Sequence, residues 1–396
     1  MAGRTGTRTV GTPRPRDRKA QIIAAASDLF YRFGYHNVGT GQIASAVGIT
    51  AGALYRHFRS KQELLAQALI DSFEQALSNV EQRQPRNLET MVEAVARIAA
   101  GRRDLGVLWN RETRHLDDQQ RDHMRGRFYS FLAAFSTELE AARDDLSADD
   151  AEMLAWCALA VMTSPSYHRT EADENTIFGL LCRMTVAVVT APVRAVAGAP
   201  EPGAHDSPGI ARTSRREAII TAATRLFRRH GYQATRMDEI GAAVGITSAA
   251  VYKYFPTKVD LLAATVARAS EPLQLGLNQA LASAATVQEG LDNALDGYID
   301  FAVVHHDLLG LLVSEVMNLP DAQRHAVRRA QHDYVAELVE LLRSVRPELG
   351  EQEAKFVLHA VLTVVNDVTR TRHLVQRPLV RQELRMIVRR LYAVGL

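Results

Sequence analysis

The sequence predicts an all-α protein made of two tandem units, and three observations support this prediction. Apolar residues recur at three- and four-residue spacing in long segments, and no alternating strand pattern bounded by turn residues occurs. A block of 49 residues occurs twice in the same register. The chain of 396 residues is also long enough to form two or more domains with full cores.

The repeated block sets the domain organisation. Residues 18–66 and 215–263 align at a constant offset of 197 without a gap, and 23 of the 49 positions are identical. The stretch "VGITAGALYRHFRSK" (Val47–Lys61) thereby matches "VGITSAAVYKYFPTK" (Val244–Lys258). A weaker match follows at an offset of 203, where Glu112 meets Glu315. Internal similarity of this length indicates that the whole half was duplicated.

The segment between the two halves is typical of a linker. "GAPEPGAHDSPGIART" (Gly198–Thr213) is rich in Pro and Gly and lacks apolar periodicity. The predicted organisation is a basic disordered tail (1–17), a helix-turn-helix domain (18–66), an α-helical regulatory domain (67–197), the linker (198–213), a second helix-turn-helix domain (214–263) and a second regulatory domain (264–396). We call residues 18–66 the first head and residues 214–263 the second head.

Each head is predicted to hold a longer helix followed by two short helices joined by a glycine turn. In the first head, Arg18–Phe33 is amphipathic, and Gly34 suits the left-handed conformation that ends many helices. Gly48 supplies the turn, and Thr50 is placed to cap the helix that follows. The two short helices are expected near Thr40–Val47 and Ala51–Phe58.

Further helices are predicted along both regulatory domains. "SKQE" (Ser60–Glu63) and "TKVD" (Thr257–Asp260) are typical capping boxes and open the next helix of each half. Apolar periodicity marks helices at Leu64–Val80, Leu88–Ala100, Phe128–Ala142 and Tyr334–Val345. We expect the final helices of the halves, Asn175–Ala197 and Pro378–Val394, to pack against one another.

The charge of the chain is concentrated in the two heads. The net charge is only +2, but residues 1–66 carry +7 and residues 210–264 carry +5, so the remaining segments sum to −10. A single basic run is as often a solvated face as a binding site. Two basic islands that coincide with the repeated element indicate a polyanion as the partner.

The second short helix of each head is the candidate DNA-reading element, because a helix-turn-helix places this helix in the major groove. Small side chains at its start would let it approach DNA closely, and Tyr55 could donate its hydroxyl to a phosphate. Lys61, at the start of the next helix, could pair with a phosphate as well. The alternatives are a half-buried core position for Tyr55 and a solvated charge for Lys61.

These stretches resemble the DNA-binding domain of the TetR family of bacterial transcriptional regulators. The motif G-[IV]-[TS]-x-x-x-[LV]-Y-x-[HY]-F-x-[ST]-K is present in both heads, and the resemblance covers about 50 residues of each half. It implies phosphate contacts by Tyr55, Lys61, Tyr252 and Lys258. It also implies that the reading helices present Thr50, Ala51, Gly52, Arg56 and His57 in the first head, and Thr247, Ser248, Ala249, Lys253 and Tyr254 in the second.

The resemblance extends more narrowly to single-chain tandem members from actinobacteria, some of which control genes of lipid uptake and catabolism. It implies a cytoplasmic, nucleoid-associated regulator, expected to be a repressor, that binds a double-stranded DNA operator and is released by a small lipophilic effector. Family members generally act as homodimers, so one chain with two heads would form an intramolecular pseudo-dimer. Further oligomerisation is left open.

The two heads differ where bases would be read, which predicts an asymmetric operator. Arg56 faces Lys253 in the alignment, and Arg can bond a guanine twice where Lys acts as a point charge. The half-sites are expected about 34–36 Å apart, one turn of DNA. Gly41 stands where the second head has Asp238, which weakens a helix of the first head. The alternative is that only one head binds DNA specifically, in a sensor or partner-binding protein.

Aromatic residues of the regulatory domains are candidates for lining an effector pocket, although ordinary helical-bundle core explains any one of them as well. The equivalent residues Glu112 and Glu315 could orient a ligand or form structural ion pairs with Arg. The candidate ligand-binding residues are Trp109, Glu112, Phe128, Phe131, Phe135, Trp156, Tyr298, Phe301, Glu315 and Tyr334.

Several other functions are not supported by the sequence. No run of about 18 apolar residues or secretory signal occurs. The two cysteines form no metal or redox motif, and His115, His123, His305 and His306 lack zinc-site spacing, so no metal and no cofactor are expected. Nucleophile elbows, phosphate-binding glycine loops and HExxH are also missing, so an enzyme is a remote alternative.

Overall fold

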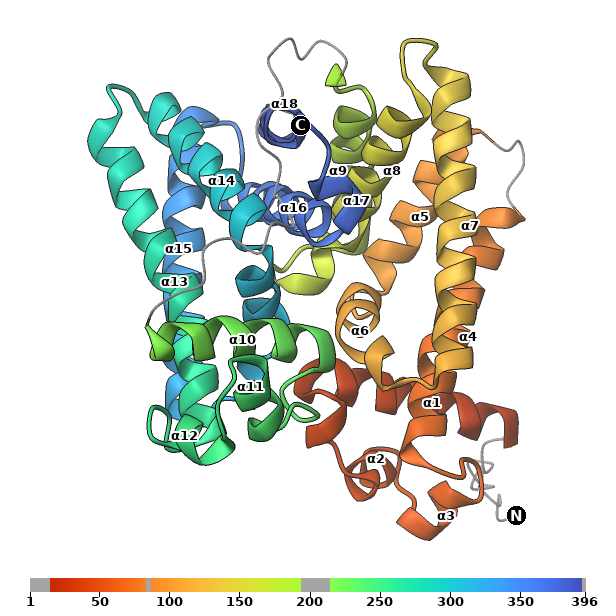
Figure 1. The fold of residues 1–396 in the computed structure, drawn as a ribbon. Coiled ribbons are helices and arrows are strands. Elements are labelled where there is room, and N and C mark those ends of the chain that lie inside the picture. The colour runs from red at the N-terminus through yellow and green to blue at the C-terminus, as the bar shows by residue number, and fades with distance from the viewer. Residues whose placement is uncertain (1–14, 83–86, 194–213, 394–396) are drawn as a thin grey trace, which may run out of the picture. The chain divides into compact units, whose positions relative to one another are not determined.

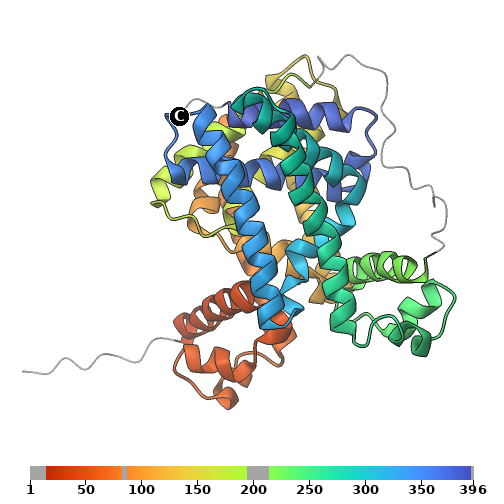
Figure 2. The same cartoon turned by 90° about the vertical axis from the view of Figure 1, so that its left-hand side faces the viewer.

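The computed structural model describes residues 15–82, 87–193 and 214–393, and within these ranges the chain is helical with no β-strand. Figure 1 shows the helices, and Figure 2 shows them from the side. The all-α prediction is therefore confirmed for the described residues. The predicted linker and residues 1–14 of the predicted tail lie outside them.

The first half begins with the three helices of the first head. Their bounds are α1 (Pro15–Phe33), α2 (Thr40–Ala46) and α3 (Ala51–Tyr55), with the short 3-10 helix η1 (Tyr35–Asn37) between α1 and α2. The rest of this half consists of α4 (Lys61–Glu81), α5 (Leu88–Gly101), α6 (Leu105–Glu112), η2 (Thr113–His115), α7 (Asp118–Ala142), α8 (Ala148–Thr163), η3 (Ser164–Tyr167) and α9 (Glu174–Val189).

The second half follows a similar order, with the single helix α14 in place of α5 and α6. The second head consists of α10 (Arg215–His230), α11 (Met237–Ala243) and α12 (Ser248–Tyr252). It is followed by α13 (Lys258–Ser283), α14 (Val287–Ser314), η5 (Val316–Asn318), α15 (Asp321–Val345), α16 (Glu351–Arg370), α17 (Arg372–Val375) and α18 (Val380–Tyr392).

The predicted helices are present, but their ends differ, and α7 and α15 begin at Asp118 and Asp321 rather than at Phe128 and Tyr334. The reading helix α3 ends at Tyr55 rather than Phe58, although the Phe58 N–H still bonds to the Leu54 carbonyl at 3.1 Å. The last helix of the first half ends at Val189, earlier than expected, because Pro192 cannot continue a helix. The capping box at Thr257 is confirmed, since its hydroxyl accepts a bond from the Asp260 N–H at 3.1 Å.

The chain forms two compact units that do not coincide with its two halves. The first unit comprises Met1–Gln75 and Val107–Met124, and the second comprises Ala76–Gly106 and Arg125–Leu396. The first unit therefore holds the first head. The second unit holds the second head together with regulatory helices from both halves.

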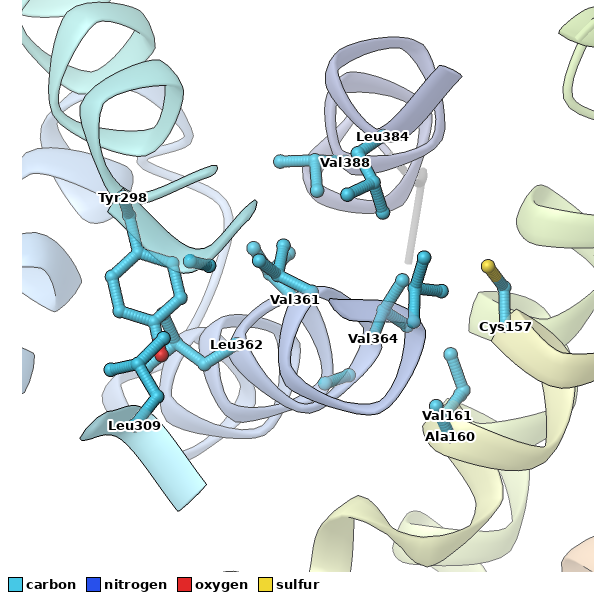
Figure 3. Packing of buried hydrophobic residues seen from close by; sticks show 14 of the residues in the cluster. Cys157, Ala160, Val161, Tyr298, Leu309, Val361, Leu362, Val364, Leu384 and Val388 are labelled. Carbon is cyan, nitrogen blue, oxygen red and sulfur yellow. The ribbon is translucent and has the colours of Figure 1, made fainter. Parts of the chain in front are cut away.

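Within the second unit, helices of the first half pack against helices of the second half. Helix α16 lies between α8 on one side and α14 on the other, with α18 above it, as Figure 3 shows. The final helices α9 and α18 also pack together, as predicted, but α8 packs on α16 more extensively. The buried side chains between these helices include Cys157, Ala160, Val161, Tyr298, Leu309, Val361, Leu362, Val364, Leu384 and Val388.

Ion pairs at the edge of this packing also join the two halves. The Arg377 guanidinium lies 2.7 Å from a carboxylate oxygen of Asp150 on α8 and 2.7 Å from one of Glu383 on α18. The His373 Nε2 lies 3.0 Å from a carboxylate oxygen of Glu152 on α8. The sequence pattern did not predict the pairing of Arg377 with Asp150 or of His373 with Glu152, because more than 200 residues separate the partners along the chain.

Candidate nucleic-acid interface

The two short helices of each head are held by the same turn and cap. Gly48 (φ +67°) and Gly245 (φ +69°) adopt left-handed backbone conformations that other residues rarely take, which explains why both turns contain glycine. The Thr50 hydroxyl accepts a bond from the Ala53 N–H at 3.2 Å, and Thr247 caps the second reading helix in the same way. The predicted helix-turn-helix geometry is present in both heads.

The structure gathers the predicted DNA-facing residues on one side of each reading helix. Tyr55 and Tyr252 are 50% and 47% exposed, so the expected alternative of a half-buried core tyrosine does not hold for either. Ser248 is half-buried, whereas the remaining residues are exposed: Thr50, Ala51, Gly52, Arg56, His57, Thr247, Ala249, Lys253 and Tyr254. On the opposite side, Leu54 and Val251 are fully buried.

The contacts that Lys61 and Lys258 share give these lysines a structural role that the sequence did not reveal. The Lys61 Nζ donates bonds to the carbonyls of Tyr35 (2.9 Å) and Val38 (3.0 Å) and lies 4.3 Å from the centre of the Tyr35 ring. Lys258 contacts the corresponding loop and the Tyr232 ring in the same way. Burial lowers the pKa of both lysines. Neither lysine is a free solvated charge, and each keeps one further N–H donor.

Two further residues of the heads were missed by sequence reasoning. The Thr40 hydroxyl lies 3.3 Å from the Tyr55 hydroxyl and can orient it, whereas the second head has the buried Met237 at the position of Thr40. In the second head, Gly241 lies where the first has Ala44. A Cβ on Gly241 would lie 2.7 Å from a backbone oxygen of the turn, so the two short helices pack more closely there. The difference between the two heads at these aligned positions could have pointed to both residues from the sequence.

Both heads rest on a buried glutamate of the regulatory domain. Glu112 accepts a bond from the backbone N–H of Tyr35 at 3.3 Å, and Glu315 accepts one from that of Tyr232 at 3.2 Å. Glu112 also pairs with Arg111 at 2.5 Å, as one of its two predicted roles required. Each glutamate thereby ties the end of the head's first helix to a regulatory helix, and we call this contact the seat of the head.

The predicted effector residues fall into separate groups. Trp109 stacks on Phe73 (4.9 Å between ring centres) and packs against the core of the first unit, where Glu112 forms part of the seat. In the second unit, the Phe128 and Trp156 rings lie 5.2 Å apart. The other close pairs there are Phe131 with Phe135, Tyr298 with Tyr334, and Phe301 with His305.

The second half also contains a buried polar contact among these aromatic residues. The Tyr298 hydroxyl donates a bond to the Asn366 side-chain oxygen at 2.9 Å, and burial raises the pKa of Tyr298 to about 12. Burial likewise raises the pKa of Tyr334. Both phenols therefore stay neutral within an apolar interior.

The described residues form neither a metal-ligand cluster nor a membrane-spanning helix. Among the residues with described positions, no three His, Cys, Asp or Glu side chains are grouped so that they could hold a metal ion. Across the same residues, no helix is long and apolar enough to cross a membrane.

Comparison with known proteins matches both heads. The family model described as "Bacterial regulatory proteins, tetR family" matches residues 22–68 and 219–265. The HTH-type transcriptional activator FasR of Mycolicibacterium smegmatis is 32% identical over 101 residues, which are 26% of this chain and 45% of FasR. The HTH-type transcriptional regulator TtgR of Pseudomonas putida is 46% identical over 56 residues, 14% of this chain and 26% of TtgR.

Other similar proteins have comparable coverage. The HTH-type transcriptional repressor KstR of Mycolicibacterium smegmatis is 26% identical over 112 residues, 28% of this chain and 54% of KstR. These matches thus span about a quarter to a half of each curated relative. A solved TetR-family regulator from Bordetella parapertussis is 18% identical with a TM-score of 0.40, and the match covers 45% of this chain and 95% of that one. PfmR from Thermus thermophilus is 22% identical with a TM-score of 0.39, covering 47% and 98%.

Proposed function

We propose, from the premise that this chain belongs to the TetR family of bacterial DNA-binding transcriptional regulators, that it reads an asymmetric operator with two unequal heads. The observation that carries the proposal is the pair of exposed reading helices. They share their phosphate-facing tyrosines but present different side chains around them. Identical heads would require a palindrome, whereas different heads read different half-sites.

The shared residues would hold the DNA backbone. The hydroxyls of Tyr55 and Tyr252 lie on exposed side chains and can donate to phosphate oxygens. Lys61 and Lys258 each begin a long helix, α4 and α13, and each has one N–H donor beyond its two carbonyl contacts. A phosphate placed there would also face the positive end of the helix dipole.

The differing residues would read bases. Arg56 can form two hydrogen bonds with a guanine, while Lys253 offers a single charged group. His57 and Tyr254 occupy the next position and are both exposed. We expect half-sites of different sequence about 34–36 Å apart, one turn of the duplex.

A single chain would replace the usual pair of subunits. The packing of α8 and α9 against α16 and α18 supports an intramolecular pseudo-dimer, because helices of the two halves share one apolar core. The Arg377–Asp150 ion pair adds a polar link between the halves. One chain would then suffice to occupy one operator.

A small lipophilic effector would control binding. The interior around Tyr298, Tyr334 and Asn366 combines apolar walls with a few hydrogen-bonding groups, which suits an apolar ligand with a polar end. By resemblance, the regulated genes would be lipid-related and the chain a repressor. Thermal-shift screening with fatty acyl, sterol-derived and hydrophobic drug-like compounds tests this. The effector proposal loses its support if none of them raises the unfolding temperature.

Selection of bound DNA from a random library, followed by the mass of the complex, tests the operator proposal. We expect a non-palindromic site occupied by one chain. A perfect palindrome protected by two chains would contradict it.

Single-hydroxyl variants then test whether both heads work. Tyr55→Phe and Tyr252→Phe should each weaken operator binding about tenfold, because each removes a hydrogen bond to a charged group. Tyr129→Phe is the matched control, since Tyr129 is 43% exposed but lies outside the heads. A loss in only one head variant would favour the alternative of a single specific head. An operator affinity that did not fall with salt would contradict binding through the DNA phosphates.

A further inference from the structure

The seats of the two heads differ at one pair of equivalent positions. Beside Glu112, the side chains of His36 and His115 meet, with ring centres 4.5 Å apart. The aligned positions in the second half are Gln233 and Asn318. Their side-chain amides form a hydrogen bond of 3.0 Å. The same contact is therefore made by two titratable rings in one half and by two neutral amides in the other.

Of the two histidines, His115 packs within the first seat, whereas His36 is exposed. The His115 ring stacks on Tyr35 at 4.9 Å between ring centres. The Lys61 ammonium lies over the Tyr35 ring, 4.3 Å from its centre. The His115 Nε2 is 3.6 Å from the carboxylate of Glu112. A change in the charge of His115 is therefore felt by the groups that hold the head.

Positive groups outnumber negative groups around His115. Arg111 on α6, Arg114 on η2, Lys61 on α4 and His36 on η1 all act against a further positive charge there. The carboxylate of Glu112 is already paired with Arg111 and accepts the Tyr35 N–H. Burial, followed by Arg114, His36, Lys61 and Arg111, lowers the pKa of His115 to about 3.

The second seat has the same anchor without a titratable ring at this position. The Asn318 amide donates to Glu315 at 2.9 Å and accepts a bond from Gln233. Glu315 in turn accepts the Tyr232 N–H. Amides do not change charge between pH 5 and 8, so this contact is independent of pH.

We propose that the histidine pair makes the seat of the first head acid-sensitive while the amide pair keeps the second seat in place, so that acid loosens one reading head selectively. This inference deepens the proposed function and rests on it where operator binding is concerned. The loosening of the seat itself requires only the contacts described above.

The direction and size of the effect follow from proton linkage. His115 is neutral in the closed seat, but a freed histidine titrates near its ordinary pKa of about 6.5. The closed seat is therefore fully stable above that pH and loses stability as the pH falls toward about 3. One such histidine raises the opening constant about fivefold over the first pH unit below 6.5, and by nearly tenfold per unit at lower pH.

Hydrogen exchange of the full chain without DNA tests the seat directly. Between pH 6.5 and 5.5, and after correction for intrinsic exchange rates, the opening constant of the amides in α1–α3 should rise about fivefold, and that of α10–α12 far less. The variant H36Q/H115N gives the first head the amide pair of the second head, so it should abolish the difference in pH response between the two heads. An equal pH response of both heads, or an unchanged response in H36Q/H115N, would overturn the inference.

Two further arms keep the test decisive. If H36Q/H115N does not fold, the reciprocal variant Q233H/N318H should make α10–α12 acid-sensitive, and failure to do so counts against the inference. Operator binding at pH 7.5 and 5.5, in wild type and H36Q/H115N, separates the two proposals. If hydrogen exchange gives the expected result but the pH dependence of operator binding is the same in both chains, the first head does not bind DNA. Only the difference between the two chains is compared, so that pH effects common to both cancel.

Discussion

The most demanding prediction concerns Arg377, which links the two halves of the chain. Its guanidinium pairs with Asp150 on α8 and with Glu383 on α18, both at 2.7 Å, and donates to the Asp149 carbonyl at 2.9 Å. The side chains of Arg377, Asp150 and Glu383 are 15%, 14% and 7% exposed. The variant R377M keeps the length of the apolar stem and removes the charge.

The cost arises from the two carboxylates that remain. Removal of one partner from a buried ion pair costs about 3–5 kcal/mol, because an uncompensated charge stays in the interior. Since all three side chains keep some contact with water, we expect about 3 kcal/mol. For a unit of this size the unfolding temperature should fall by roughly 5–10 °C.

Differential scanning calorimetry at pH 7.5 measures this loss. R343M is the matched control, because Arg343 pairs with Glu340 on the surface with exposures of 39% and 66%, and we expect a change below about 1 kcal/mol. The variant R377M/D150N/E383Q removes all three charges and should recover much of the stability. If R377M loses no more than R343M, or if the triple variant is no more stable than R377M, the buried-charge reasoning is wrong.

Three other predictions follow from the structure. Gly41→Ala should stabilise the first head by about 0.5–1 kcal/mol, because a Cβ there meets nothing within 4 Å. Gly241→Ala should destabilise the second head, because a Cβ there would lie 2.7 Å from a backbone oxygen. Melting temperatures that shift in the same direction for both variants would refute this. Burial lowers the pKa of the stacked rings of His168 and His359 to about 2 and about 4, so stability is full above about pH 6.5 and falls in acid. H359Q should flatten the dependence of the free energy of unfolding on pH. An unchanged slope below pH 6.5 would contradict a contribution from His359. Lys258→Met should cost about 1–3 kcal/mol by loss of two carbonyl contacts, seen as faster hydrogen exchange in α10–α12, and unaltered exchange would assign this lysine no structural role.

Local features of the heads could be predicted because they depend on neighbouring residues. A glycine in the turn and a threonine before the reading helix determine a left-handed residue and a cap within a few positions, and Gly48 and Thr50 adopt these roles. The alternation of buried and exposed positions likewise placed Tyr55 outside. The ends of helices were less predictable, as α3 and α9 show, since small contributions decide where a helix stops.

Partners distant along the chain could not be predicted in the same way. The sequence suggested Lys61 as a phosphate contact, but its ammonium also holds the loop after α1. Glu112 was expected to form an ion pair or orient a ligand, and its bond to the Tyr35 N–H across 77 positions was not foreseen. Such contacts depend on how helices pack, and apolar periodicity gives the face of a helix but not its neighbour.

The sequence by itself determined the helical class, the duplication, the positions of both heads and the side chains that differ between them. Those properties follow from local propensity and from comparison of one half with the other. Only the tertiary structure decided that α8 packs on α16, that Arg377 joins the halves, and that a histidine pair in one seat is replaced by an amide pair in the other. These contacts bring together residues far apart in the chain, so they exist only once the helices have packed and buried their apolar faces.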